Sequence, residues 1–390
     1  IPYTLPSAKT ENEYWINFTF VLNADTPWAK QGFEIAWAQF KLPVETLSLY
    51  IDSSDMENLI RNESKNAIEI IGNNFKLLFD KHYGKIISYV YNGKDLIHDG
   101  PRINLWRAPT DNDVHQAKLW KQIGLDRLIS RISDISYTAI NPQTVKINVS
   151  QVLAPYSLKP VCDSKITYTI YGNGDVDISA NLSFCIEPPQ LWHMMPPEFM
   201  HVLHASNIAW EQIPKALPLS MLYLPRIGME MQVPKGIEMF EWYGRGPHEN
   251  YVDKKESAKI DIYKSTIDEQ HVPYIRPQEN GNKLDVRWAA VTDLQGDGWL
   301  IMGKPMFNIS VHHYTTHDLT QAEHTYELPH RDETTINIDY AQGGLGSNSC
   351  GPEPLDKYKL KPENVTFGFI LRPFSKNSTS PNSLSKIYPL

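Results

Sequence analysis

Hydrophobic and polar residues alternate with a period of two along much of this chain, which is the pattern of half-buried β-strands. Val145–Val149 alternates in this way, and so do Ile166–Ile170 and Val176–Leu182. The last two runs flank Asn173-Gly174, a dipeptide that favours hairpin turns because both of its residues tolerate positive φ. These residues therefore predict an antiparallel β-hairpin.

A second hairpin is predicted from Phe75–Phe79 through a turn at Asp80–Gly84 to Ile86–Tyr91. Asn92-Gly93 then turns the chain again at once. Short strands at such regular spacing are typical of an all-β sandwich or barrel.

Only one segment has a convincing helical pattern. Asp113 is a candidate N-cap for it, and Gly124 is a candidate stop signal. Between them, apolar residues recur every third position at Val114, Ala117, Trp120 and Ile123. The spacing predicts a helix over 114–123 within an otherwise all-β chain.

The strand pattern divides the chain into four parts. Residues 1–55 hold only three or four candidate strands, about half of what an immunoglobulin-like β-sandwich needs. Residues 56–66 are polar and predict a linker. Residues 67–374 show no comparable break and predict one large β domain with two big sheets. Residues 375–390 are rich in Ser, Asn and Pro and predict a frayed tail or a surface strap.

Composition excludes several classes of function. There are 37 Lys and Arg against 45 Asp and Glu, for a net charge of −8, which argues against a nucleic-acid partner. No apolar run approaches the roughly 18 residues of a membrane helix, so no membrane partner is expected. The three cysteines are too few for a disulfide framework and form no Cys-x-x-Cys pair. They fit a reducing cytoplasm, with the periplasm as the alternative compartment.

The first residues, Ile1-Pro2-Tyr3, carry neither an initiator Met nor a signal peptide. We therefore expect a chain that is processed, trimmed or cut from something longer.

Common catalytic signatures such as G-x-S-x-G, H-E-x-x-H and phosphate-binding glycine loops are absent from the sequence. His313 and His317 are four residues apart, a spacing that could bind metal on a helix. However, Asn308–Tyr314 alternates like a strand, where residues four apart lie about 13 Å from each other. We therefore expect no metal site in this chain.

Four segments are denser in constrained and polar residues than a framework needs. The first places two carboxylates and an amide before the predicted helix, which is more than a cap requires. The last has four glycines in nine residues, a loop that lets the backbone approach something closely. The segments are Trp106–Asp113, Trp242–Tyr251, Pro273–Gly281 and Gly343–Pro352.

Together these segments resemble, in order and in approximate spacing, the C-terminal part of the glycoside hydrolase family 2 β-galactosidases. The family motifs are R-A-P-x-D-N-D, G-x-G-P-x-E-N-Y, P-Y-x-x-P-x-E-N-G and a glycine-rich loop before the final strand. Met306–Ser310, with His317 and His324 downstream, matches the family's F-N-I-S segment. Trp15–Leu42 resembles the second half of the immunoglobulin-like domain that precedes the last domain. The resemblance covers roughly residues 10–374.

The resemblance implies which domains of the family this chain contains and which domain carries the catalytic residues. The family's domains are a jelly roll, an immunoglobulin-like sandwich, a TIM barrel, a second sandwich and a large β supersandwich similar to galactose mutarotase. This chain would supply the end of the fourth domain and all of the fifth. The family is retaining and uses two carboxylates about 5 Å apart, and both lie in the barrel with the Mg and Na sites. We therefore expect no catalytic residue, metal or cofactor here, and expect Glu249 and Glu279 to accept hydrogen bonds in turns.

The resemblance also implies that the last domain forms part of the active-site rim. In the best-known members, a Trp in the glycine-rich loop stacks on the sugar of the leaving group. The matching residue here is Cys350, whose thiol has no π face, so stacking would be lost or supplied elsewhere. Alternatively, Cys350 is a small packing residue. The expected rim residues are Asp111, Asn112, Asp113, Ser347, Asn348 and Cys350.

The resemblance implies three partners: a β-galactoside substrate, the barrel-containing remainder of the enzyme and further copies of the chain in a homo-oligomer. Two other functions stay open. An aldose-epimerase-like enzyme could use His248 or His271 with Glu249 or Glu279 as base and acid on a free sugar. A carbohydrate-binding module would instead use exposed Trp or Tyr platforms.

Overall fold

The computed structural model describes residues 12–44, 49–186, 222–375 and 379–390, and strands dominate it. A five-stranded sheet has the order β4 (Ile60–Glu63), β5 (Ala67–Ile71), β6 (Phe75–Asp80), β7 (Lys85–Tyr91) and β8 (Lys94–Asp95). The all-β prediction is therefore confirmed.

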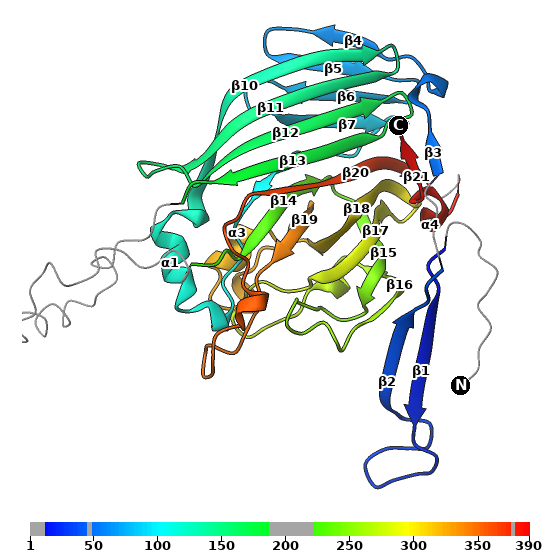
Figure 1. Cartoon of the computed structure of the whole chain (residues 1–390), viewed down its shortest axis with the longest axis vertical. Helices are drawn as coiled ribbons and strands as arrows, with labels where there is room; N and C mark the ends of the chain where they lie inside the picture. Colours follow the sequence, from blue (N-terminus) through cyan, green and yellow to red (C-terminus); the bar gives the residue numbers. More distant parts are fainter. Residues whose placement is uncertain (1–11, 45–48, 187–221, 376–378) are drawn as a thin grey trace, which may run out of the picture.

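A second, twelve-stranded sheet forms the rest of the body (Figure 1). Its main path is β10 (Leu128–Asn141), β11 (Thr144–Pro155), β12 (Cys162–Tyr171), β13 (Val176–Phe184), β20 (Val365–Ser375), β18 (Asp297–His312), β17 (Lys283–Asp293), β15 (Ile237–Gly246) and β16 (Lys259–Thr266). A branch holds β9 (Asp99–Asn104), β14 (Arg226–Val233) and β19 (Thr334–Gln342). All pairings within this sheet are antiparallel.

The two sheets share one hydrophobic core. Residues on β5, β6, β11 and β12 alternate between buried and more exposed positions, as the period of two predicts. Across the interface, the Phe79 ring meets Tyr168 edge-on at 5.3 Å, and Tyr89 meets Trp299 at 4.7 Å. Tyr89 also donates its hydroxyl to the carbonyl of Gly174 at 2.5 Å, so the phenol is satisfied inside the core.

Both predicted hairpins are present, but the turn at Asn173-Gly174 differs in type. The loop has three residues, because Tyr171 N donates to Asp175 O and Gly174 N to Tyr171 O. Only Gly174 has positive φ (+92°), as in a type I turn followed by a left-handed residue. The turn at Asn92-Gly93, with φ of +49° and +83°, does use both positions.

Helices are few and short: α1 (Gln116–Gln122), α3 (Thr316–Gln321) and α4 (Pro381–Leu384) are the α-helices described. Single 3-10 turns lie at Ser53–Asp55, Asp111–Asp113, Leu125–Arg127, Asp268–Gln270, Thr325–Glu327 and Asp356–Tyr358. In the part of the chain that the structure describes, no helix has both the length and the apolar character to cross a membrane.

The predicted helix over 114–123 is shorter in the structure, and one of its signals was misread. Gly124 (φ +78°) follows its C-terminus, as expected. Asp113 does not cap α1; the N-cap is His115, which makes no side-chain cap bond. Asp113 belongs to the preceding 3-10 turn, and a buried arginine holds it there. Val114, expected on the apolar face, is 46% exposed.

Part of the segment expected to be a linker, Ile60–Glu63, forms the edge strand β4. Its residues are exposed and mostly polar, so the sequence pattern does not indicate a strand.

The N- and C-terminal segments pair with each other. In the segment expected to be a tail, β21 (Ile387–Pro389) pairs in parallel with β3 (Leu49–Ile51). Arg372 donates to the carbonyls of Leu384 and Ile387, so this segment is a fixed strap.

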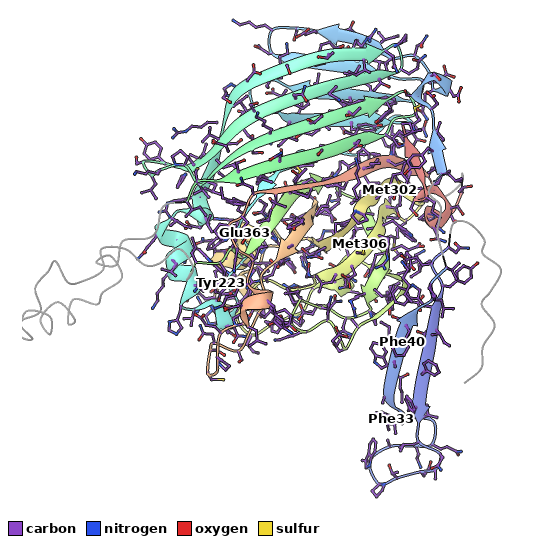
Figure 2. All side chains as sticks on the ribbon, in the orientation of Figure 1. Phe33, Phe40, Tyr223, Met302, Met306 and Glu363 are labelled. Atoms are coloured by element: carbon purple, nitrogen blue, oxygen red, sulfur yellow. The ribbon has the colours of Figure 1, made fainter. Side chains whose placement is uncertain are left out.

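The hairpin of β1 (Trp15–Val21) and β2 (Glu34–Lys41) projects from the body, and Figure 2 shows Phe33 and Phe40 along it. At its base the Arg287 guanidinium lies 5.7 Å from the Trp15 ring and 5.3 Å from the Tyr243 ring. Glu13 binds Arg287 at 3.1 Å and accepts from the Tyr243 hydroxyl at 2.7 Å. Burial opposes its charge, but the bond from Lys41 and the charge of Arg287 lower the pKa of Glu13 to about 2.

Replacing Glu13 by Gln should loosen the hairpin. The pKa of Glu13 lies below its unfolded value of 4.5, so the stabilisation is complete above about pH 4.5 and is lost as the pH falls toward 2. We expect E13Q to lower the opening free energy of the β1–β2 amides by about 1–2 kcal/mol at pH 7, after discounting for solvent screening, and by less at pH 4. Hydrogen exchange measures this.

The matched control is Glu34→Gln on the same hairpin, which removes a more exposed ion pair with Lys259. Equal effects of the two substitutions, or no pH dependence for E13Q, would contradict the role given to Glu13.

Candidate functional site

A buried arginine joins the two segments that the sequence analysis placed at the rim. Arg107 is fully buried, and its Nε and Nη2 bind the Asp113 carboxylate at 3.1 and 2.7 Å. Its Nη1 donates to the carbonyl of Gly343 at 2.6 Å, and Nη2 also reaches Gly344 O at 3.4 Å. Burial opposes the charge, but the Asp113 carboxylate outweighs it and raises the pKa of Arg107. One guanidinium therefore holds both segments.

A second set of contacts fixes the glycine-rich loop itself. The Asp253 carboxylate accepts from the amides of Leu345 and Gly346 at 3.1 and 2.7 Å. Asn112 donates to Gly346 O at 2.9 Å, and its oxygen accepts from the amide and hydroxyl of Ser349 at 3.1 and 2.8 Å. Gly346 has φ of +62°, which a residue with a Cβ would adopt only under strain.

Behind the loop lies a buried network around Arg226. Its guanidinium binds Asp339 at 2.9 Å, Glu279 at 2.7 Å and the carbonyl of Trp106 at 3.2 Å. Gln342 donates to both carboxylates at 3.2 Å. Burial raises the pKa of Asp339 to about 7; Arg226 opposes this shift and Glu279 adds to it. The network connects Trp106 of the first segment to Glu279 of the third, and Gln342 directly precedes the last segment.

The six predicted rim residues lie on the two segments that Arg107 joins, but they differ in access. Asp113 is 1% exposed and has both oxygens engaged, so it holds its own segment in place and is not accessible to a ligand. The others are exposed or half-buried: Asp111, Asn112, Ser347, Asn348 and Cys350. Asp111 contacts the Gln278 amide at 3.3 Å, and Cys350 is a free, exposed thiol.

The two glutamates of the central motifs serve as hydrogen-bond acceptors. Glu249 accepts from Gly281 N at 2.8 Å and from the Tyr274 hydroxyl. Glu279 is 4% exposed and binds Arg226. Both carboxylates are therefore occupied by the framework, as expected from their place in turns.

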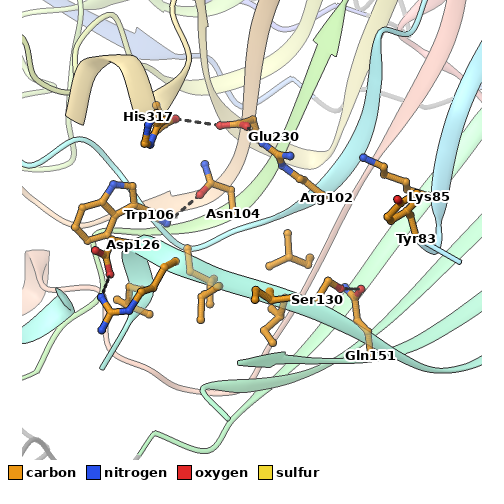
Figure 3. Close-up of a pocket in the computed structure, with 18 of the residues that line it drawn as sticks. Tyr83, Lys85, Arg102, Asn104, Trp106, Asp126, Ser130, Gln151, Glu230 and His317 are labelled. Atoms are coloured by element: carbon orange, nitrogen blue, oxygen red, sulfur yellow. Dashed lines mark hydrogen bonds and ion pairs between the residues drawn. The ribbon is translucent and has the colours of Figure 1, made fainter. Parts of the chain in front are cut away.

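Sequence reasoning missed a cavity of about 1130 Å³, shown in Figure 3. Within it, Arg102 donates to Glu230 at 2.5 Å, and the Thr316 hydroxyl donates to the other oxygen of Glu230 at 3.0 Å. Trp106 lines the wall and donates to Thr320 at 3.1 Å. The lining comes from segments scattered between His82 and Gln321, so no local motif could reveal it. The cavity reaches the first of the four segments, because Trp106 is the first residue of that segment.

Replacing Arg107 by Met should destabilise the protein by about 3–5 kcal/mol, because the Asp113 carboxylate would remain buried without its cation. Urea unfolding measures the change. The control is Arg127→Met, which removes an exposed ion pair with Asp126 and should cost less than about 1 kcal/mol. Similar costs for the two substitutions would contradict the role assigned to Arg107.

Comparison with known proteins gives the family. The family described as beta galactosidase small chain matches residues 71–371, and beta-galactosidase domain 4 matches residues 1–43. A beta-galactosidase of Priestia megaterium is 32% identical over 354 residues, which cover 89% of this chain and 30% of that protein. One of Kluyveromyces lactis is 30% identical over 383 residues, covering 94% and 33%.

This chain spans about a third of the length of the curated relatives it matches. Among solved structures, an aldose epimerase homologue from C. elegans is 10% identical and covers 82% of this chain and 99% of that chain. Its TM-score of 0.37 is too low to support an argument about fold. On the match over residues 71–371, the chain belongs to the beta-galactosidase small-chain family.

Proposed function

We propose that this chain is the C-terminal region of a β-galactosidase that hydrolyses terminal β-galactosides with retention. Its contribution is the rim of an active site whose catalytic carboxylates lie in a TIM barrel outside this sequence. The observation that carries the proposal is the pair of bonds from the buried Arg107 guanidinium to Asp113 and to the carbonyl of Gly343. These bonds hold Asn112 beside the glycine-rich loop, to which it also donates. A loop held this firmly can form one wall of a pocket completed by another part of the protein.

The proposed absence of catalytic residues rests on how the carboxylates are used. A retaining glycosidase needs a nucleophile and an acid/base that reach the sugar. Glu279 is buried in an ion pair with Arg226, and Glu249 holds the backbone of Gly281. Neither carboxylate is available for that chemistry, which supports a catalytic pair elsewhere.

Within this proposal Cys350 takes the rim position where the best-known family members have a Trp. It is exposed, and its amide donates to Ser347 O at 3.1 Å, so a tight turn displays the thiol. A thiol cannot stack on a sugar ring, so leaving-group stacking must come from another side chain. Asp111, Ser347 and Asn348 would supply polar contacts beside it.

The β1–β2 hairpin supports the proposal that residues 1–55 are the C-terminal half of an immunoglobulin-like sandwich, with residues 67–374 as the small-chain domain. Large apolar side chains along the hairpin are more than half exposed: Phe20, Phe33, Ile35 and Phe40. A sheet of two strands is marginal alone. The preceding part of the enzyme would cover this hairpin.

The Mg and Na ions that the family implies are assigned to the barrel. Both ions prefer oxygen ligands. Among the residues that the structure describes, one group brings three candidate ligands together, and two of its members are imidazoles. That group does not fit either ion. The proposed full enzyme is a homo-oligomer that acts in the cytoplasm.

The geometry does not favour an aldose-epimerase-like reaction. His248 lies 2.9 Å from the Ser257 hydroxyl, and the His271 ring packs 4.9 Å from that of Tyr314. Burial lowers the pKa of His271, and a bond to Asn280 opposes that shift. Within the described ranges, neither histidine is hydrogen-bonded to Glu249 or Glu279.

Hydrolysis of a chromogenic β-galactoside tests the proposal. We expect no turnover by the purified chain alone, and turnover after mixing with the preceding, barrel-containing part of the same protein. Mixing with a chain carrying Arg107→Met should restore less activity, while Arg127→Met should match the unsubstituted chain. Turnover by the chain alone would refute the proposal and would make Glu249 and Glu279 candidate catalytic residues.

A further inference from the structure

Two histidines and an aspartate from three separate segments lie close together beside the ends of β16, β18 and β19. Asp268 lies in a 3-10 turn after β16, His313 directly follows β18, and His330 lies before β19. One possible ligand atom from each lies within 4.8 Å of the others. The imidazole rings of His313 and His330 stack with centroids 4.5 Å apart, and His330 Nε2 is 2.9 Å from Asp268 Oδ1. His317, which the spacing paired with His313, is not in this group.

The backbone around these residues is fixed independently of any ligand. Arg331 N donates to His313 O at 3.0 Å, which ties the two histidine segments together. The Arg331 guanidinium donates two hydrogen bonds to the Asp318 carboxylate, at 2.6 and 2.7 Å. On the other side, Ile267 N donates to Glu238 O at 2.9 Å and anchors the turn that carries Asp268. The group is therefore held in place by its scaffold.

The His313 ring lies between two oxygen acceptors. Its Nδ1 lies 3.4 Å from the carbonyl of Glu333. Its Nε2 faces the Glu238 carboxylate at 3.1 Å. A backbone carbonyl on the other ring nitrogen is the usual partner of a metal-bound histidine.

We propose that this group binds a zinc ion through His313, His330 and Asp268, with Glu238 as the fourth ligand. Two imidazoles with carboxylates suit Zn²⁺, whose bonds of about 2.0–2.2 Å bring tetrahedral ligands to roughly 3.5 Å of one another. His313 is fixed, with 2% of its side chain exposed. Asp268 and His330 are 68% and 55% exposed. This proposal does not depend on the proposed function.

The geometry gives such an ion a structural role. Its ligands come from β15, the turn after β16, the end of β18 and the loop before β19. A bound zinc would cross-link that loop to the sheet beside α3, whose Thr316 and Thr320 line the cavity. Zinc should therefore raise the melting temperature of the protein, because it binds the folded state alone.

Calorimetric titration of the purified protein with Zn²⁺ tests the proposal. The exposed thiols of Cys185 and Cys350 also bind zinc, so the titration uses the C185S/C350S variant. We expect one equivalent to bind, and H330A and D268A each to weaken binding at least about tenfold. Both substituted residues are exposed, so the fold should persist, which circular dichroism checks. The matched control is H82A, an exposed histidine outside the group.

Three results would overturn the proposal. The first is no saturable zinc binding by the C185S/C350S protein. The second is unchanged affinity in both H330A and D268A, which would put the ion elsewhere. The third is an equal loss in H82A, which would indicate nonspecific binding to surface histidines. A rise in melting temperature with zinc that H330A abolishes and H82A retains would support the site independently.

Discussion

The buried guanidinium of Arg107 is the interaction on which the candidate site depends. It spans 236 residues of sequence to bind the carbonyl of Gly343 while holding Asp113. A buried ion pair is costly unless its other hydrogen-bonding groups also have partners, and here the carbonyls of Gly343 and Gly344 accept from the guanidinium beside Asp113. The glycine-rich loop is consequently held at its root, and Asp253 and Asn112 extend that order to its tip.

The features that the sequence predicted well are local. Alternation with period two identifies β11, β12 and β13 because one face of each strand is buried against the other sheet. The hairpin at Asn173-Gly174 was predicted because turn chemistry is local too, although the turn type was not. The ordered motifs also contain the residues that the buried guanidinium joins, since Arg107 and Gly343 lie in two of the four segments singled out.

The features that escaped prediction depend on contacts between distant residues. The local sequence predicts Asp113 as a helix cap, since nothing local reveals that the Arg107 guanidinium binds its carboxylate in the interior. β4 read as a linker, because an edge strand exposed on both faces has no buried alternation. The cavity and the histidine group are assembled from residues tens to hundreds of positions apart. His313 carries no hint in sequence that its partner is His330 and not His317.

In the proposed enzyme, the loop held by Arg107 forms the rim of an active site supplied by another part of the protein. Thiol labelling of Cys350 tests this, with the other exposed thiol, Cys185, as the internal reference. In the chain combined with its barrel-containing part, a galactoside should slow alkylation of Cys350 and leave Cys185 unaffected; in the chain alone it should slow neither. Alkylation of Cys350 at the same rate with and without galactoside in the combined enzyme would contradict this role of the loop.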